Sequence, residues 1–81
     1  LGYLITRITR VDRTRTQLGA RFWEVQTDRG PRSFAMKDPS RSVNIMDDGC
    51  MFLWDTLGNC YEIESYDSLD EHSRKQVDRI V

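Results

Sequence analysis

The sequence is poor in the residues from which metal centres, disulfide frameworks and catalytic sites are most often built. Its 81 residues include one histidine, His72, and two cysteines, Cys50 and Cys60. These three cannot supply the four Cys or His ligands of a structural zinc site. Two cysteines are also too few for a secreted disulfide framework. No apolar run approaches the ~20 residues that a membrane-spanning helix needs.

Residues that could act as a nucleophile or a base are explained by local structure. Ser68 and Ser73 lie on either side of His72, but closeness in sequence is not the geometry of a catalytic triad, and Ser68 suits a helix N-cap. Asp47-Asp48-Gly49 lacks the spaced oxygen ligands of a calcium loop and indicates a hairpin turn. The glycines stand singly, so no phosphate-binding loop is present. We therefore expect no enzyme activity, no catalytic residue, no metal and no cofactor.

Charge is distributed unevenly along the chain, although its net value is only −1. Residues 1–41 hold 9 basic and 4 acidic residues, whereas residues 42–81 hold 3 basic and 9 acidic residues, so the two halves carry +5 and −6. Two interpretations follow: the halves neutralise each other across a sheet, or the basic half presents a surface to an anionic partner.

Alternating apolar residues predict a hairpin in the basic half. Residues 21–30 and 31–37 each form a strand pattern, and the turn Asp28-Arg29-Gly30 lies between them. Phe22 and Glu24 point away from the core and need other cover. The residues expected to face the core are Trp23, Val25, Phe34 and Met36.

The preceding segment is ambiguous. Residues 3–11 are rich in β-branched and aromatic residues, which favours a strand. Ile5, Ile8 and Val11 are nevertheless spaced by three, as on one face of a helix, and nearby threonines argue for the strand. Residues 12–19 are polar and predict an exposed loop.

Three more strands are predicted in the acidic half: residues 42–46 with Val43 and Ile45 inward, residues 50–55, and a segment around residues 61–63. Residues 50–55 are apolar on both faces, which is typical of a strand inside a sheet. If Leu57-Gly58-Asn59 is the turn between the last two strands, the numbers of facing residues add up to about 114.

That register separates the two cysteines. It places Cys60 opposite Trp54 and Cys50 near Glu64, which is too far apart for a disulfide. We expect two half-buried free thiols.

The last residues change to a helical period. Ser68-Leu69-Asp70-Glu71 fits a capping box, with Asp70 as an alternative N-cap, and a helix of about three turns should follow, laid across an open edge or end of the sheet. The predicted fold is mainly β (α+β): about six short antiparallel strands in hairpins forming a small barrel-like or sandwich sheet, with one C-terminal helix packed on it. Residues 1–81 form one domain, expected to be a fragment or the C-terminal part of a longer chain.

One functional hypothesis comes from the residues themselves. Aromatic side chains alternate with arginines in the basic half, and sheets that bind single-stranded nucleic acid use aromatic platforms with basic rims. The same aromatic residues are needed for the core of so short a domain. The residues concerned are Tyr3, Phe22, Trp23, Phe34, Arg7, Arg10, Arg21 and Arg32.

The chain also resembles a known family. The pattern Trp-Glu-Val-x-Thr-Asp-Arg-Gly at residues 23–30, Asp38-Pro39, Asp48-Gly49, Gly58-Asn59 and Tyr61-Glu62-Ile63 is similar to bacterial domain-of-unknown-function family 1854. Its members occur as short free-standing proteins, some beside cyanophycin-metabolism genes, or as a domain attached to ABC-transporter ATPase and permease chains.

The resemblance implies a bacterial cytoplasmic protein with a non-catalytic accessory or regulatory role. We expect it to bind a protein partner or an adjoining domain, such as a transporter ATPase, through an arginine-bearing face. The candidate partner surface consists of Arg21, Arg29 and Arg32. No membrane insertion is expected, and single-stranded nucleic-acid binding is the alternative.

Overall fold

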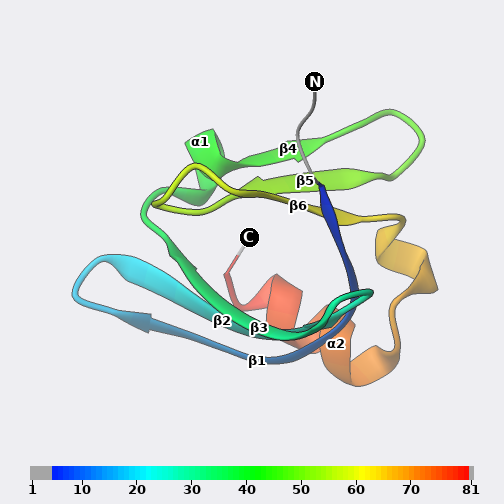
Figure 1. Ribbon diagram of the computed structural model, residues 1–81, viewed down its shortest axis with the longest axis horizontal. Helices are drawn as coiled ribbons and strands as arrows, with labels where there is room; N and C mark the ends of the chain where they lie inside the picture. Colours follow the sequence, from blue (N-terminus) through cyan, green and yellow to red (C-terminus); the bar gives the residue numbers. More distant parts are fainter. Residues whose placement is uncertain (1–4, 81) are drawn as a thin grey trace.

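The computed structural model describes residues 5–80 and consists of one curled six-stranded sheet with a helix beside it (Figure 1). The strands occur in the spatial order β3-β2-β1-β6-β5-β4. Their bounds are β1 Thr6–Gln17, β2 Ala20–Thr27, β3 Gly30–Met36, β4 Val43–Ile45, β5 Met51–Trp54 and β6 Cys60–Ile63. The helices are α1 Pro39–Ser42, the 3₁₀ turn η1 Tyr66–Ser68, and α2 Glu71–Asp78.

The sheet is built from two antiparallel meanders. The first meander is β1–β3 and the second is β4–β6. They join through a short parallel pairing of β1 with β6, from Thr6 opposite Tyr61 to Ile8 opposite Ile63. The two meanders curl toward each other across the core (Figure 1), but β3 and β4 remain edge strands, so the sheet does not close into a barrel. The predicted mainly β class with one C-terminal helix is confirmed.

Strand β1 corrects one prediction and resolves another. Residues 12–17, predicted as loop, belong to β1, which ends only at the turn formed by Leu18 and Gly19. Register shifts between Ile8 and Arg10 and between Val11 and Arg13 each add one residue to the strand. Ile8, Val11 and Thr14 therefore all face inward at a spacing of three, because each bulge moves the alternation of the strand by one position. The ambiguous helical spacing was the mark of a bulged strand.

The core lies between the two meanders. Trp23 and Phe34 stack with centroids 5.7 Å apart, and Phe34 stacks on Tyr61 of β6 at 4.2 Å. These three rings link the first meander to the second, and offset aromatic pairs of this kind add about 0.5–1.5 kcal/mol beyond area burial. All four residues predicted to face the core from the central hairpin are buried: Trp23, Val25, Phe34 and Met36.

The second meander has the predicted register. Trp54 is opposite Cys60 and Met51 is opposite Ile63, and both cysteines are free and buried. Strand β5 is paired on both sides, as its apolar sequence predicted. Ile45 lies on the same side of the sheet as buried Met51, but it is 63% exposed because β4 is the edge strand.

The C-terminal helix lies beside the part of β1 that has no strand partner on that side. Helix α2 begins after Asp70, whose carboxylate accepts a hydrogen bond from the Ser73 N–H at 2.9 Å, so Asp70 is the N-cap and Ser68 belongs to η1. The helix is shorter than predicted, about two turns. Beyond Ile8, strand β1 is no longer paired with β6. Ser73 there accepts a hydrogen bond from the Val11 N–H at 2.8 Å, and Gln76 accepts one from the Thr14 N–H at 3.0 Å. The predicted position along an open sheet edge is confirmed.

Within residues 5–80, none of the helices has the length and apolar character required to span a membrane.

Candidate partner-binding surface

Arg21 is held within the fold. It lies at the start of β2, opposite Met36, and its guanidinium donates hydrogen bonds to the carbonyl oxygens of Gly19 at 3.1 Å and Lys37 at 2.9 Å. These bonds tie the turn after β1 to the end of β3. Arg21 therefore has a structural task that its sequence position did not reveal.

Arg29 and Arg32 lie at the opposite end of the hairpin. Arg29 is exposed in the β2–β3 turn, where its N–H donates to the Thr27 hydroxyl at 3.0 Å. Arg32 is exposed at the start of β3 and donates to the Pro31 carbonyl at 2.8 Å. At about 3.3 Å per residue, the length of β2 separates Arg29 from Arg21 by roughly 26 Å. The structure thus places Arg29 and Arg32 at the same end of the hairpin, with Arg32 opposite the core-facing Val25, and leaves Arg21 at the other end.

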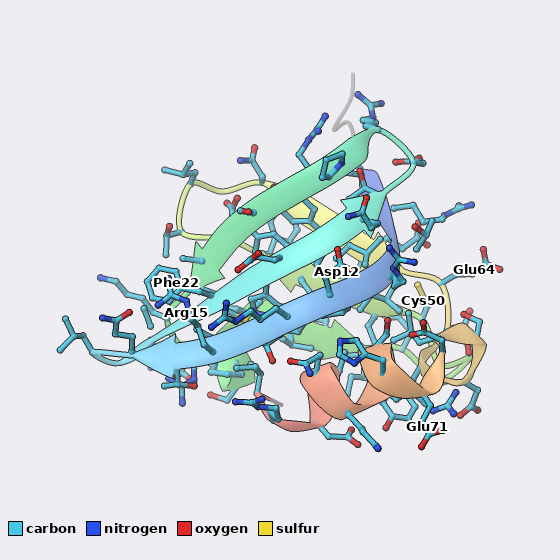
Figure 2. The ribbon with its side chains drawn as sticks, turned by 90° about the horizontal axis from the view of Figure 1, so that it is seen from below. Asp12, Arg15, Phe22, Cys50, Glu64 and Glu71 are labelled. Atoms are coloured by element: carbon cyan, nitrogen blue, oxygen red, sulfur yellow. The ribbon has the colours of Figure 1, made fainter. Side chains whose placement is uncertain are left out.

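Two arginines not chosen from the sequence occupy the outer, convex face of the first meander. Arg15 is opposite Phe22, and Arg13 is opposite Glu24. The Arg15 guanidinium lies over the Phe22 ring, 4.5 Å from its centroid, and Figure 2 shows the two side chains together on the sheet. The cover that Phe22 was expected to need is therefore the guanidinium. Sequence analysis missed this pair because residues 12–19 were assigned to a loop.

A shallow hollow of about 330 Å³ adjoins this pair on the outer face. It is bordered by Arg15, Phe22, Glu24, Ser33 and Ala35, which occupy adjacent outward positions on β1, β2 and β3. An arginine fixed over an aromatic ring, beside a carboxylate and a hydroxyl, offers both apolar and polar contacts. Arginine and aromatic residues are enriched in protein interfaces for this reason. We call Arg13, Arg15, Phe22, Glu24 and Ser33 the outer-face site.

The cations of the first meander fall into two groups. Arg7 lies 3.5 Å from Glu62 and 3.6 Å from Glu64, and Arg10 lies 3.0 Å from Asp12. A hydrogen bond from Gln26, at 2.7 Å, is the main cause that lowers the pKa of Asp12. By contrast, four exposed arginines of the first meander have no carboxylate of a described residue within 4 Å: Arg13, Arg15, Arg29 and Arg32.

The two thiols are poorly suited to act as nucleophiles. Burial, with the Glu62 carboxylate 3.3 Å from the Cys50 sulfur, raises the pKa of Cys50 to about 11. Burial also raises the pKa of Cys60. Because their pKa values are raised, both thiols are almost fully protonated at neutral pH. Since the thiolate is the reactive form, neither thiol is a good nucleophile.

His72 contacts the backbone of β1, and the acidic residues do not form a metal site within the described residues. The His72 Nε2 atom lies 2.8 Å from the Asp12 carbonyl oxygen, across the contact between α2 and β1. In the part of the chain that the structure describes, no three His, Cys, Asp or Glu residues are grouped so that they could hold a metal ion.

The outer face of the second meander is apolar. A hollow of about 310 Å³ lies over β4, β5 and the approach to β1. Ile5 and Met46 at its border are 42% and 44% exposed. Its lining residues are Ile5, Asn44, Met46, Phe52, Trp54 and Cys60. The apolar pattern on both faces of residues 50–55 was visible in the sequence, but it was interpreted only as burial.

Trp23 and Phe34 cannot stack on nucleotide bases, because both rings are buried in the core. Phe22 is the aromatic residue of the described first meander that faces outward, and its ring is occupied by Arg15. Tyr3 lies outside the described residues. The aromatic platform proposed from the sequence is therefore reduced to one ring.

The fold defines a small, mainly β domain made of two meanders and an edge-covering helix. The chain belongs to the family described as domain of unknown function DUF1854, whose family model matches residues 1–80. No curated protein and no solved structure matches this chain.

Proposed function

We propose that this domain is a non-catalytic accessory or regulatory module of a bacterial cytoplasmic protein, and that it binds a protein partner through the first meander. The observation that carries the proposal is the set of exposed arginines without a neighbouring carboxylate, two of them at the outer-face site. Unpaired arginines beside an aromatic ring match an acidic partner surface, and they increase the rate of association as well as specificity.

The absence of catalysis is part of the proposal. Its support is the chemistry of the candidate groups: protonated thiols at Cys50 and Cys60 and a histidine engaged with the Asp12 carbonyl. General bases and nucleophiles need a pKa matched to the working pH and a partner within hydrogen-bond reach.

The proposed partner is an ABC-transporter ATPase, or a protein of cyanophycin metabolism, as the family resemblance implies. The test is a pull-down with the 81-residue chain from a lysate of its source bacterium, followed by mass spectrometry. Two double variants separate the arginine groups: Arg13→Glu with Arg15→Glu, and Arg29→Glu with Arg32→Glu. The matched control, Lys37→Glu with Arg79→Glu, reverses two exposed charges elsewhere.

We expect the wild type and the control to retain a transporter ATPase, and the Arg13/Arg15 variant to lose it at least tenfold, with binding that weakens as salt screens the charges. Retention that is equal in all four proteins, or absent from the wild type, would contradict the proposal. Circular dichroism of each variant verifies that the sheet is intact.

Single-stranded nucleic-acid binding is the alternative function that the same arginines allow. Titration of a labelled oligonucleotide at ~50 mM salt separates the two, because phosphate contacts make affinity fall steeply with salt. We expect no measurable binding, since the only outward ring of the first meander, within the described residues, lies under Arg15.

A further inference from the structure

Within residues 5–80, β4 has no strand paired to its outer side. The Met46 N–H donates to the Cys50 carbonyl at 2.8 Å, and hydrogen-bonded and non-bonded pairs alternate along antiparallel strands. Ile45, opposite Met51, therefore belongs to a non-bonded pair, and its N–H and C=O point away from β5. Val43 has the same orientation, because its N–H turns outward to the Pro39 carbonyl.

The side chain of Ile45 is also uncovered. It is 63% exposed and borders a hollow of about 330 Å³ on the core side of β4. That hollow opens between the β4–β5 hairpin and α2, and Ile45, Gly49, Met51, Tyr66, Val77 and Asp78 line it. An edge strand with an exposed apolar side chain beside such a hollow is a site where another strand can be added to the sheet.

The other edge of the sheet is protected. Pro31, the second residue of β3, has no N–H to donate. Further along the strand, the Ala35 carbonyl accepts a hydrogen bond from the Thr56 N–H at 2.9 Å, so the β5–β6 turn covers that end of the edge. Pairing through β3 is thus hindered at both ends. Among the described residues, β4 is covered only where α1 precedes it.

Charge determines which strand fits β4. Its first end adjoins Arg41, whose side chain is 88% exposed and lies 4.0 Å from the Asp38 carboxylate. Its second end runs into the exposed acids Asp47 and Asp48. A second β4 strand in antiparallel orientation brings the basic end of each copy beside the acidic end of the other. A parallel copy would bring like charges together, which is unfavourable.

We propose that a second copy of this chain pairs with the first through β4, in antiparallel orientation, about a two-fold axis between the two Ile45 residues. The Ile45 N–H of each copy donates to the Ile45 carbonyl of the other, as a closed two-fold contact requires. Residue 42 then lies opposite residue 48, which places Arg41 beside the partner's Asp47 and Asp48. The two sheets become continuous, and the facing Ile45 side chains close the mouths of the two hollows.

Sedimentation velocity of the 81-residue chain between about 5 and 500 µM tests the pairing, since so short a strand contact predicts a dimer that dissociates in the micromolar range. We expect Ile45→Lys to remain a monomer throughout. Leu57→Lys and Leu18→Lys are matched controls, because both leucines are exposed apolar residues in turns, 84% and 99%, and both should dimerise like the wild type. A wild type that stays monomeric at 500 µM, or an Ile45→Lys variant that still dimerises, would overturn the proposal.

A charge swap tests the orientation. Arg41→Asp alone, or Asp47→Arg alone, should raise the dimer dissociation constant about tenfold, because each change places like charges at both contacts. Asp48 is left unchanged because its carboxylate accepts a hydrogen bond from the Cys50 N–H at 3.0 Å in the β4–β5 turn. The double variant exchanges the two charges and should recover the wild-type constant. Failure of the double variant to recover would exclude the antiparallel two-fold arrangement.

Hydrogen exchange gives a measurement that does not depend on substitution. In the monomer the Ile45 N–H points away from β5 and has no backbone acceptor among residues 5–80, whereas in the proposed dimer it is hydrogen-bonded. Its exchange should slow at least tenfold from 5 to 500 µM, while the Met46 N–H, bonded within the monomer, should not change. Equal behaviour of the two amides would contradict pairing through β4.

Discussion

The two meanders have the same strand connectivity, but they differ in strand length and in the character of their outer faces. The strands of the first meander are 12, 8 and 7 residues long, whereas those of the second are 3, 4 and 4 residues long. The long strands bury one face and turn a polar, basic face outward, as in a one-sided antiparallel sheet. The second meander exposes apolar side chains on its outer face, around Glu62 and Asn44, and includes the edge strand β4. The first meander is thus the part suited to an acidic partner, and the second is the part suited to apolar and backbone contacts.

Charge separates the meanders in the same way, except at their junction. Arg7 of β1 lies within 3.6 Å of both Glu62 and Glu64, so the basic and acidic halves neutralise each other where β1 meets β6. Away from the junction, the acids of the second meander lie in turns, whereas Arg13 and Arg15 of the first meander lie on its outer face. The first interpretation of the charge pattern, mutual neutralisation, is therefore confirmed at this junction. The second, a basic surface for an anionic partner, stays a prediction.

The largest expected effect is a loss of folding stability, and it should differ between the inner and the outer face of β2 in the first meander. Trp23→Ala should lower the free energy of unfolding by about 3–5 kcal/mol, because it removes a buried ring from the aromatic stack. Phe22→Ala, one position earlier on the outer face, should cost about 1 kcal/mol through loss of the Arg15 contact. Urea denaturation measures both.

A third variant separates packing from hydrogen bonding at this position. The buried Trp23 Nε1 atom has no hydrogen-bond partner among residues 5–80, so Trp23→Phe should cost clearly less than Trp23→Ala. Equal losses for Trp23→Ala and Phe22→Ala would show that the two faces of β2 are not energetically distinct.

The next largest loss of stability is expected where α2, and not a strand, lies beside β1. Ser73→Ala leaves the buried Val11 N–H without its acceptor and should cost about 1–3 kcal/mol. Ser68→Ala, which removes an exposed hydroxyl bonded to the Ser65 carbonyl, should cost much less in the same urea experiment. If the two serines proved equivalent, α2 would not act as the substitute neighbour of β1.

The outer face of the second meander can be tested through Cys50. With a pKa of about 11, its reaction with iodoacetamide at pH 8 should be roughly 100-fold slower than in the unfolded chain. Glu62→Gln should lower that pKa and accelerate labelling, because the nearby carboxylate disfavours the thiolate. A Cys60→Ser background isolates the signal, and an unchanged rate in Glu62→Gln would contradict the role of the Glu62 carboxylate.

The smallest effect should appear at the N-cap of α2. Hydrogen bonds from Ser73 lower the pKa of Asp70 below its ordinary value of 3.8. A lowered folded-state pKa stabilises the protein above the unfolded pKa, and this contribution is lost as the pH falls through the folded pKa. Asp70→Asn retains a good N-cap, so it should match the wild type at pH 7 and lose less stability below pH 4. Parallel thermal unfolding curves at pH 7 and pH 3 measure the difference.

The sequence predicted the strands best where their alternation is regular. Trp23, Val25, Phe34 and Met36 face the core as expected, and the pairing of Trp54 with Cys60 follows from the position of one turn. β1 was predicted less well, because its two bulges interrupt the alternation and because polar residues 12–17 are stabilised as a strand by β2 and α2. A bulge adds no distinctive residue type, so composition does not reveal it.

The candidate surface shows the same limit. Arg29 at the hairpin tip could be placed from the turn sequence. The structural task of Arg21 depends on the Gly19 and Lys37 carbonyls, which are brought together only when β1, β2 and β3 are assembled. The pairing of Arg15 with Phe22 depends equally on the register of β1, and both contacts therefore required the folded sheet.

By itself, the sequence determined the mainly β class, the hairpin turns, the inward residues of the regular strands and the presence of a C-terminal helix, but not which of Ser68 and Asp70 is its N-cap. These features depend on local backbone preference and on the period of apolar residues, which act over a few positions. The tertiary structure decided the parallel joining of β1 with β6, the use of α2 as a neighbour for β1, the arginines that stay unpaired, and the edge at Ile45. Those features arise from contacts between residues far apart in the chain, whose geometry exists only once the two meanders have packed around a common core.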